Sequence, residues 1–190
     1  MPIFDPNTLE AQPTRPLPFG AHVRHGGVHF SVFSRHAERL WLGLFHDPND
    51  TEPAWTYAFE PQRDRFGDCW SVFVRGLGEG VCYAYRADGP NDFAAGHHYD
   101  PSAWVIDPYA RAIRGDIAAN TMKGVTVRSG PLPGPRPRTP MDQTVIYETH
   151  VRGLTRHASA GVEQPGTYAG LIEKIPYLKD LGVTAVELLP

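Results

Sequence analysis

The chain has 190 residues, of which 41% are hydrophobic and 21% are charged, so it can bury a core and is too apolar to be disordered. Its 18 basic and 21 acidic side chains give a net charge of −3 without runs of one sign. This balance argues against nucleic acid and anionic membranes as partners. The 19 glycines and 19 prolines indicate many turns, and therefore many short strands.

No stretch approaches the ~18 consecutive apolar residues of a membrane helix, and the N-terminus lacks the basic and apolar regions of a secretory signal. Cys69 and Cys82 are too few for a disulfide framework or a metal cage. His22, His25 and His29 are spaced like a metal cluster, but no cysteine or carboxylate completes a four-coordinate set. We therefore expect a cytoplasmic protein with reduced thiols, no metal and no cofactor.

The first 90 residues predict an arm followed by short strands. Residues 1–17 are rich in proline and predict an extended arm. Over residues 18–90, β-branched and aromatic runs alternate with clusters of glycine, proline, asparagine and aspartate. The predicted fold is therefore mainly β, with an immunoglobulin-like antiparallel β-sandwich. The predicted strands are residues 28–33, 40–45, 54–59, 69–74 and 81–86.

A hairpin is the clearest local prediction. Two β-rich runs, residues 69–74 and 81–86, flank a loop at 75–80 that holds three glycines. Glycine supplies the positive φ angles that a tight reversal needs. No helix follows this loop, so it does not match a phosphate-binding loop.

The residue pattern changes in the second half of the chain. Residues 91–140 predict an irregular connector that ends in a proline-rich linker, the best domain boundary in the chain. In residues 141–190, a strand precedes a helix that Thr167 caps and Gly182 ends, and a second strand follows. We expect Pro176 to kink this helix. Strand, helix and strand form one βαβ unit of a parallel sheet.

One βαβ unit cannot cover both faces of its own sheet. A complete (β/α)₈ barrel takes about 250 residues, far more than the segment 141–190 contains. We therefore expect this segment to be the incomplete start of such a barrel, and the chain to be the N-terminal portion of a larger protein.

The sequence VIYETHVRGLT at residues 145–155 resembles the first barrel strand of isoamylase-type enzymes of glycoside hydrolase family 13, the α-amylase superfamily. Residues 167–190 are similar to the first barrel helix and second strand of that family. Residues 96–101 and 106–113 resemble the connector of glycogen debranching enzymes, and residues 18–90 resemble the preceding domain of carbohydrate-binding module family 48. The resemblance implies an O-glycosyl hydrolase, an α-1,6-glucosidase that acts on branch points of glycogen or limit dextrin.

Catalysis is expected outside this chain. Retaining glycosidases need two carboxylates about 5–5.5 Å apart, and in the resembled family both lie on later barrel strands. We therefore predict no catalytic residue here and no hydrolysis by the 190-residue chain alone. Glu148 and Glu187 would lie on neighbouring strands, and we interpret them as structural.

The expected partner is an α-glucan, because aromatic faces stack on glucose rings. Trp55 and Trp41 are the candidate carbohydrate-binding residues. Glycogen-binding modules of the resembled family place a lysine and an aromatic residue where this sequence has Ala84 and Pro90. We therefore expect the sandwich to act mainly as a support for the barrel.

Two alternatives remain open. The chain could be a free-standing glucan-binding or scaffold module. Its unpartnered βαβ unit argues against this alternative. It could also be the N-terminal part of a related branching or maltooligosyl-trehalose hydrolase enzyme. The first strand of those enzymes usually departs from the Val-Arg-Gly found at residues 151–153.

Overall fold

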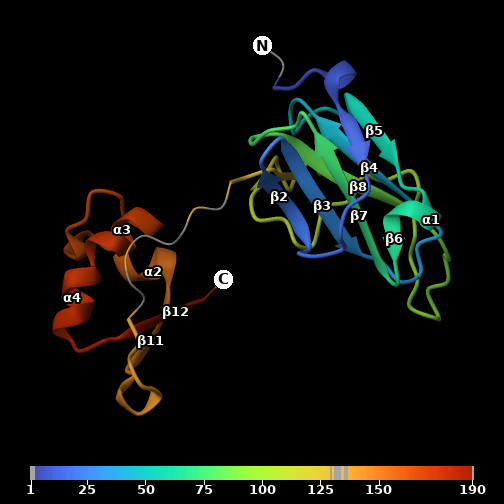
Figure 1. The fold of residues 1–190 in the computed structure, drawn as a ribbon. Coiled ribbons are helices and arrows are strands. Elements are labelled where there is room, and N and C mark those ends of the chain that lie inside the picture. The colour runs from blue at the N-terminus through green and yellow to red at the C-terminus, as the bar shows by residue number, and fades with distance from the viewer. Residues whose placement is uncertain (1–2, 129, 131–133, 135–136, 190) are drawn as a thin grey trace. The chain divides into compact units, whose positions relative to one another are not determined.

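The structure is a computed structural model that describes residues 3–128, 130, 134 and 137–189. It divides into two compact units, residues 1–131 and residues 132–190, which are described separately. The first unit consists of two packed antiparallel sheets, and the second is a small α/β unit (Figure 1). Part of the predicted proline-rich linker lies outside the described residues.

The two sheets of the first unit confirm the predicted antiparallel β-sandwich. The first sheet has the order β1 (Glu10–Gln12), β7 (Cys69–Arg75), β3 (Gly27–Phe33) and β2 (Gly20–Arg24), with β6 (Arg65–Phe66) also beside β7. The second sheet has the order β5 (Trp55–Ala58), β4 (Arg39–Phe45), β8 (Cys82–Asp88), β10 (Lys123–Val125) and β9 (Ile113–Arg114). Two short helices complete the unit, η1 (Pro6–Thr8) and α1 (Pro61–Asp64).

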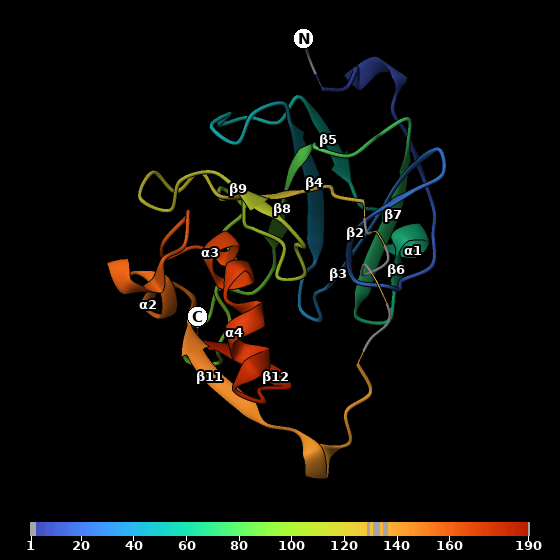
Figure 2. The same ribbon diagram turned by 90° about the vertical axis from the view of Figure 1, so that its left-hand side faces the viewer.

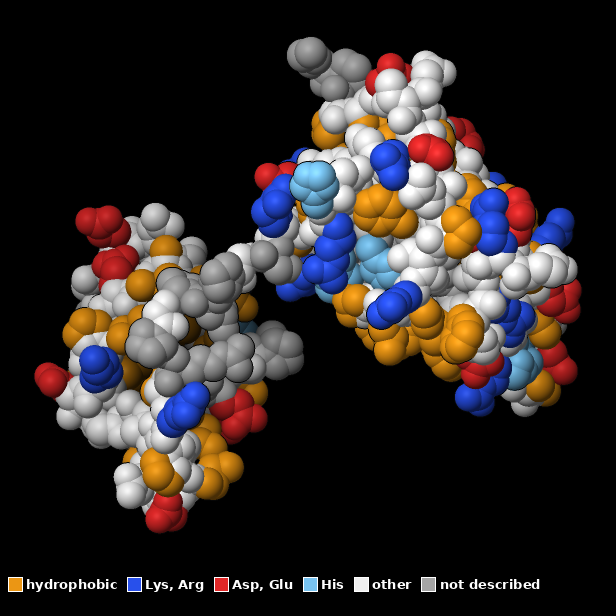
Figure 3. All heavy atoms as spheres, viewed as in Figure 1, with side chains coloured by type: hydrophobic (Ala, Val, Ile, Leu, Met, Phe, Trp, Pro, Cys, Tyr) orange, Lys and Arg blue, Asp and Glu red, His pale blue; other side chains and the backbone are white. Residues whose placement is uncertain are grey.

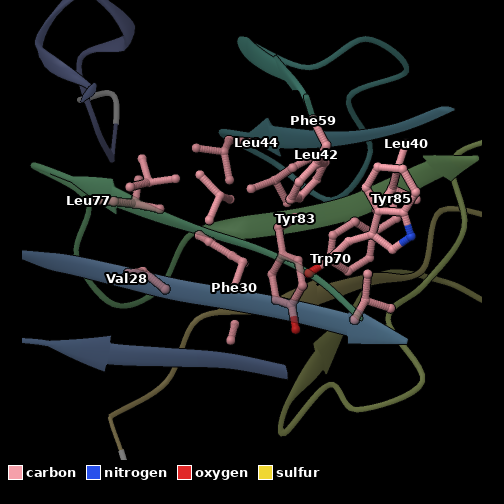
Figure 4. Close-up of a cluster of buried hydrophobic side chains, with 14 of the residues drawn as sticks. Val28, Phe30, Leu40, Leu42, Leu44, Phe59, Trp70, Leu77, Tyr83 and Tyr85 are labelled. Atoms are coloured by element: carbon pink, nitrogen blue, oxygen red, sulfur yellow. The ribbon is translucent and has the colours of Figure 1, made fainter. Parts of the chain in front are cut away.

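Alternate residues of each strand point into the space between the sheets, where they form one core. Trp70 and Tyr83 are fully buried there. Their polar atoms are satisfied, since Trp70 Nε1 donates to Ser34 O (3.0 Å) and the Tyr83 hydroxyl donates to Asp107 Oδ2 (2.7 Å). Burial raises the pKa of both Tyr83 and Asp107. Figure 4 shows the side chains that meet in the core, including Val28, Phe30, Leu40, Leu42, Leu44, Phe59 and Tyr85.

The predicted hairpin between residues 69–74 and 81–86 is wrong. β7 pairs with β3, whereas β8 pairs with β4, so the loop between them crosses from one sheet to the other. Gly76 and Gly80 do adopt positive φ angles, of 82° and 86°. Between them Leu77 is buried in the core, which anchors the loop between the sheets. A glycine-rich loop between two strands is compatible with both connections, and only packing distinguishes them.

The sandwich extends beyond the predicted range 18–90 in both directions. β1 lies within the predicted arm and pairs with β7. β9 and β10 lie within the predicted connector, where β10 pairs with β8. These short strands satisfy backbone groups that β7 and β8 would otherwise leave unpaired at the sheet edges.

The rest of the arm crosses the outer face of the first sheet. Every second carbonyl along it accepts a hydrogen bond from a side chain of the sheet, which fixes the arm at three points. Ser71 Oγ donates to Thr14 O (3.1 Å), Ser31 Oγ donates to Pro16 O, and His29 Nε2 donates to Pro18 O (3.0 Å).

The second unit has the predicted strand–helix–strand order. β11 (Ile146–His150) and β12 (Ala185–Leu189) pair in parallel, with Ile146 opposite Ala185. Figure 2 shows these strands side by side, with two helices beside them. The intervening elements are α2 (Val151–Thr155), η3 (Ala158–Ala160), α3 (Tyr168–Glu173) and α4 (Ile175–Asp180), and η2 (Met141–Gln143) precedes β11.

The predicted single kinked helix is two helices. Thr167 caps α3 as expected, but α3 ends at Lys174 and α4 begins with Pro176 in its first turn. At this position the missing N–H of proline removes no helical hydrogen bond, so a break replaces the predicted kink. Gly182 follows α4 with a φ of 81°, and its N–H donates to Lys179 O (3.0 Å), as in a Schellman motif.

The second unit leaves much of its apolar surface uncovered. Leu178 of α4 is buried, but Ile172 is 62% exposed and Ile175 is 48% exposed. Val186 and Leu188 of β12 are also exposed. The parallel pair therefore leaves apolar side chains partly exposed in the part of the chain that the structure describes.

Thr126, directly after β10, ties the loop between the sheets to the core. Its Oγ1 accepts from Val81 N (3.0 Å) and donates to Gly78 O (2.9 Å). We expect Thr126→Val to lower the free energy of unfolding by about 2 kcal/mol, because the buried Val81 N–H loses its acceptor. Urea denaturation measures the change. The exposed Thr56→Val is the control, and an equal loss in both variants would contradict this role.

Burial of His29 lowers its pKa below 6.5, opposed by the hydrogen bond to Pro18 and assisted by the charges of His22 and Arg24. The unfolded chain therefore binds the proton more readily, and stability should fall as the pH drops below about 6.5. We expect His29→Gln to reduce the slope of unfolding free energy against pH between about pH 7.5 and 5.5. The exposed His25→Gln should keep the wild-type slope; identical slopes for all three proteins would refute the expectation.

Candidate functional site

The outer face of the second sheet carries a second buried cluster. It consists of Phe45, Cys82, Ala84 and Val125, and the connector residue Trp104 packs against it. A polar outer face would be expected for a sheet that faces water. The apolar cluster and Trp104 therefore show that the connector, rather than water, covers this part of the outer face.

Trp104 is held in place by the residue that follows it. Val105 and Tyr85 form an isolated β-bridge through two backbone hydrogen bonds of 2.9 and 2.7 Å. The Trp104 ring then lies edge-on to Phe45, with centroids 5.6 Å apart. It also lies so close to Gly43 that a Cβ there would be 2.8 Å from Trp104 Cη2. Only glycine at position 43 leaves room for the indole.

Arg86 lies against the Trp104 ring, with its Cζ 4.2 Å from the ring centroid. Arg86 Nε and Trp104 Nε1 are both buried, and neither has a hydrogen-bond partner among the described residues. Unpaired buried donors are rare because each one costs free energy. The surface around Trp104 therefore combines a cation–aromatic pair with two unpaired buried donors.

A pocket of about 280 Å³ opens beside Trp104, between residues 49–51 and residues 119–123. Internal hydrogen bonds fix both loops, such as Asp47 N to Asp50 Oδ2 (2.9 Å) and Asp116 N to Thr121 Oγ1 (2.9 Å). The pocket is lined by side chains that form no hydrogen bond within the described part of the chain, namely Asn49, Thr51 and Asn120. These amides and this hydroxyl remain available to a ligand.

Lys123 lies at the floor of the same pocket. Its Nζ donates to Pro48 O (2.6 Å) and lies 4.5 Å from the centroid of the Phe45 ring. Burial lowers the pKa of Lys123. The ammonium group retains further donors beyond the one that Pro48 accepts.

Lys123 lies next to the position on β8 where glycogen-binding modules of the family have a lysine and this chain has Ala84. Gly124 pairs with Tyr83 across the antiparallel β10 and β8, which places Lys123 opposite Ala84. The cation that Ala84 lacks on β8 is therefore present on the neighbouring strand. Sequence analysis missed it because residues 84 and 123 become neighbours only in the folded sheet.

The pocket combines an aromatic surface, amides, a hydroxyl and an ammonium group. A hydroxyl-rich ligand with apolar ring faces matches this combination, because its C–H faces pack on aromatic rings and its hydroxyls bond to amides. The glycine within the strand at residue 43 is the sequence signal that could have revealed Trp104, since a strand glycine often marks a close approach.

The two tryptophans predicted to bind carbohydrate lie on opposite faces of the second sheet. Trp41 points outward and contacts Arg39, whose Cζ is 5.4 Å from the ring. Trp55 pairs opposite Leu44 and packs against the core, stacked on Tyr57 with centroids 5.9 Å apart. The structure therefore does not bring Trp41 and Trp55 together, and neither of them lines the pocket beside Trp104.

The other candidate residues occupy separate places. Glu148 and Glu187 are exposed and directly opposite each other in the parallel pair, where like charges are unfavourable.

The rings of His22 and His29 are 6.1 Å apart, and each ring donates to a backbone carbonyl. Over the described ranges, no group of three or more histidine, cysteine, aspartate or glutamate residues is arranged to hold a metal ion. Both cysteines are free.

The sandwich matches a known family of carbohydrate-binding domains. Residues 18–110 match the family model of carbohydrate-binding module 48, described as the isoamylase N-terminal domain. These residues belong to that family, as the resemblance predicted. None of the described helices is long and apolar enough to cross a membrane.

Relatives extend the match over most of the chain. Chloroplastic isoamylase 1 of Oryza sativa subsp. japonica is 40% identical over 92% of this chain and 24% of its own length. A glycogen debranching enzyme of Yersinia enterocolitica is 37% identical over 92% of this chain and 29% of its own length. The solved structure of a pullulanase from Anoxybacillus sp. LM18-11, complexed with maltotriose, has a TM-score of 0.64 at 28% identity. It covers 91% of this chain and 24% of the pullulanase chain.

These similarities establish that the chain is homologous to isoamylase-type glycoside hydrolases, which confirms the predicted resemblance. The chain spans about a quarter of the length of the curated relatives that it matches.

Proposed function

We propose that this chain is the N-terminal part of a cytoplasmic glycogen debranching enzyme that hydrolyses α-1,6-glucosidic branch linkages in glycogen or limit dextrin. The observation that carries the proposal is the 37–40% identity to isoamylase 1 and a glycogen debranching enzyme over 92% of the chain. That similarity includes the sandwich and the βαβ unit, and so it favours this function over a free-standing module.

The βαβ unit supplies a further argument for the proposal. A parallel strand pair with exposed apolar side chains needs additional strands and helices to cover it. We propose that β11, the following helices and β12 begin a (β/α)₈ barrel. The catalytic carboxylates would then lie on strands beyond this chain, and Glu148 and Glu187 would remain structural residues of the barrel wall.

We further propose that the pocket beside Trp104 contacts an α-glucan. Its aromatic surface and unpaired amides suit glucose units, and residues 18–110 belong to a family of carbohydrate-binding modules. The pullulanase relative was solved with bound maltotriose. In this role, the sandwich would bind a glucan chain directly.

The enzyme assignment is tested by comparing two proteins, the 190-residue chain and the product of the reading frame extended past Pro190. We expect the extended protein to release reducing ends and linear chains from glycogen and limit dextrin, and the 190-residue chain to release none. Hydrolysis by the short chain, or transfer to new branches by the extended protein, would contradict the assignment.

The glucan contact is tested by calorimetric titration of the 190-residue chain with maltoheptaose. We expect Trp104→Ala to weaken binding by about tenfold, equivalent to ~1.4 kcal/mol. Asn120→Gly should also weaken it, and glycine accepts the left-handed φ of 53° at this position without strain. Trp55→Ala is the matched control and should leave binding unchanged. Loss of binding only in Trp55→Ala would instead place the contact at the edge strand β5.

A further inference from the structure

His150 is the last residue of β11 and pairs in register with Leu189, the last residue of β12. Both strands therefore end at the same level, and β11 leads directly into α2 there (Figure 2). In (β/α)₈ enzymes, the carboxyl ends of the strands and the loops that follow them form the face that receives the substrate. His150 therefore lies on the substrate face of the barrel that we propose to begin with this strand pair.

The ring proton of His150 has a defined position. His150 Nδ1 accepts from Arg152 N (3.0 Å) and Gly153 N (3.4 Å), and the side chain thereby caps α2. A ring nitrogen that accepts from N–H groups carries no proton, so these hydrogen bonds assign the proton of the neutral ring to Nε2. The start of α2 thus makes the other edge of the ring a hydrogen-bond donor.

This donor has no acceptor among the described residues. Both hydrogen bonds of the His150 ring are at Nδ1, and the side chain is exposed. His22 and His29 differ, because their Nε2 atoms donate to the carbonyls of Phe19 and Pro18. His150 therefore keeps an oriented donor for a ligand at the end of the strand.

An exposed apolar side chain lies beside this donor. Leu189, opposite His150 in the parallel pair, is 44% exposed. In the view of Figure 3, further apolar side chains lie on the surface of the second unit. A glucose unit has both hydroxyl oxygens and apolar C–H faces, so a donor next to an apolar side chain suits it.

We propose that His150 binds the α-glucan substrate of the complete enzyme by donating a hydrogen bond from Nε2 to a glucose hydroxyl oxygen. The inference rests on the proposed function and deepens it, because it assigns a substrate contact to this chain while the catalytic carboxylates would lie on later strands. The ring keeps its proton in this role. The contact is present before and during the reaction, so it strengthens substrate binding and leaves the chemical step unchanged.

The test is steady-state debranching of limit dextrin by the protein extended past Pro190, as wild type and as His150→Asn. Asparagine is a strong N-cap, and its Oδ1 takes the place of the histidine Nδ1. Its amide nitrogen takes the place of the ring carbon Cδ2 and falls short of the position of Nε2. We expect KM to rise about fivefold, with kcat within about twofold of wild type and an unchanged melting temperature.

His157→Asn is the matched control. His157 is also exposed and caps η3 through Nδ1, which accepts from Ser159 N (3.3 Å), but it lies beyond the end of the strand. This variant should keep the KM and the kcat of wild type. An equal rise in KM for both variants would overturn the inference, as would a wild-type KM for His150→Asn.

The same measurements separate this inference from the proposed function. A lower melting temperature together with a lower kcat in His150→Asn would indicate a structural role and overturn the substrate contact. If the extended wild-type protein releases no linear chains, the proposed function fails and the inference fails with it. A wild type that debranches, with no change in His150→Asn, refutes the inference alone.

Discussion

The alternation of side chains along β4 and β8 is the constraint on which both the core and the candidate glucan pocket depend. Successive residues of a strand point to opposite faces, so Leu42 and Tyr83 enter the core while Gly43 and Ala84 face outward. The inward side chains form the core between the two sheets. The outward side chains at Gly43 and Ala84 are small, and Trp104 packs over them. A shift in register by one residue would exchange the two faces, so one hydrogen-bond ladder fixes both features.

Features encoded by neighbouring residues could be predicted from the sequence. The five predicted strands form, and Thr167 and Gly182 cap the helical segment as expected. The hairpin at residues 69–86 could not be predicted correctly, because its turn chemistry is shared with a connection between sheets. Buried Leu77 and the hydrogen bonds of Thr126 decide that connection, and Thr126 lies directly after β10, 45 residues beyond Val81.

The candidate site was harder to predict for the same reason. Residue type alone suggested Trp41 and Trp55, but the register between β4 and β5 places them on opposite faces. Lys123 reaches the outer face only because β10 joins the sheet beside β8. Asn49 and Asn120 line one pocket although they are 71 residues apart in the sequence. No local pattern contains these relations, whereas the resemblance to a family correctly indicated the kind of domain.

The close approach of Trp104 to Gly43 has a consequence for how this surface can change during evolution. Any side chain at position 43 would collide with the indole, so a larger residue there requires a smaller one at position 104. The two positions are 61 residues apart in sequence but act as one unit of substitution. Relatives with a larger residue at position 43 should therefore have no indole over the outer face of the second sheet. The surface that they offer to a ligand should differ in shape accordingly.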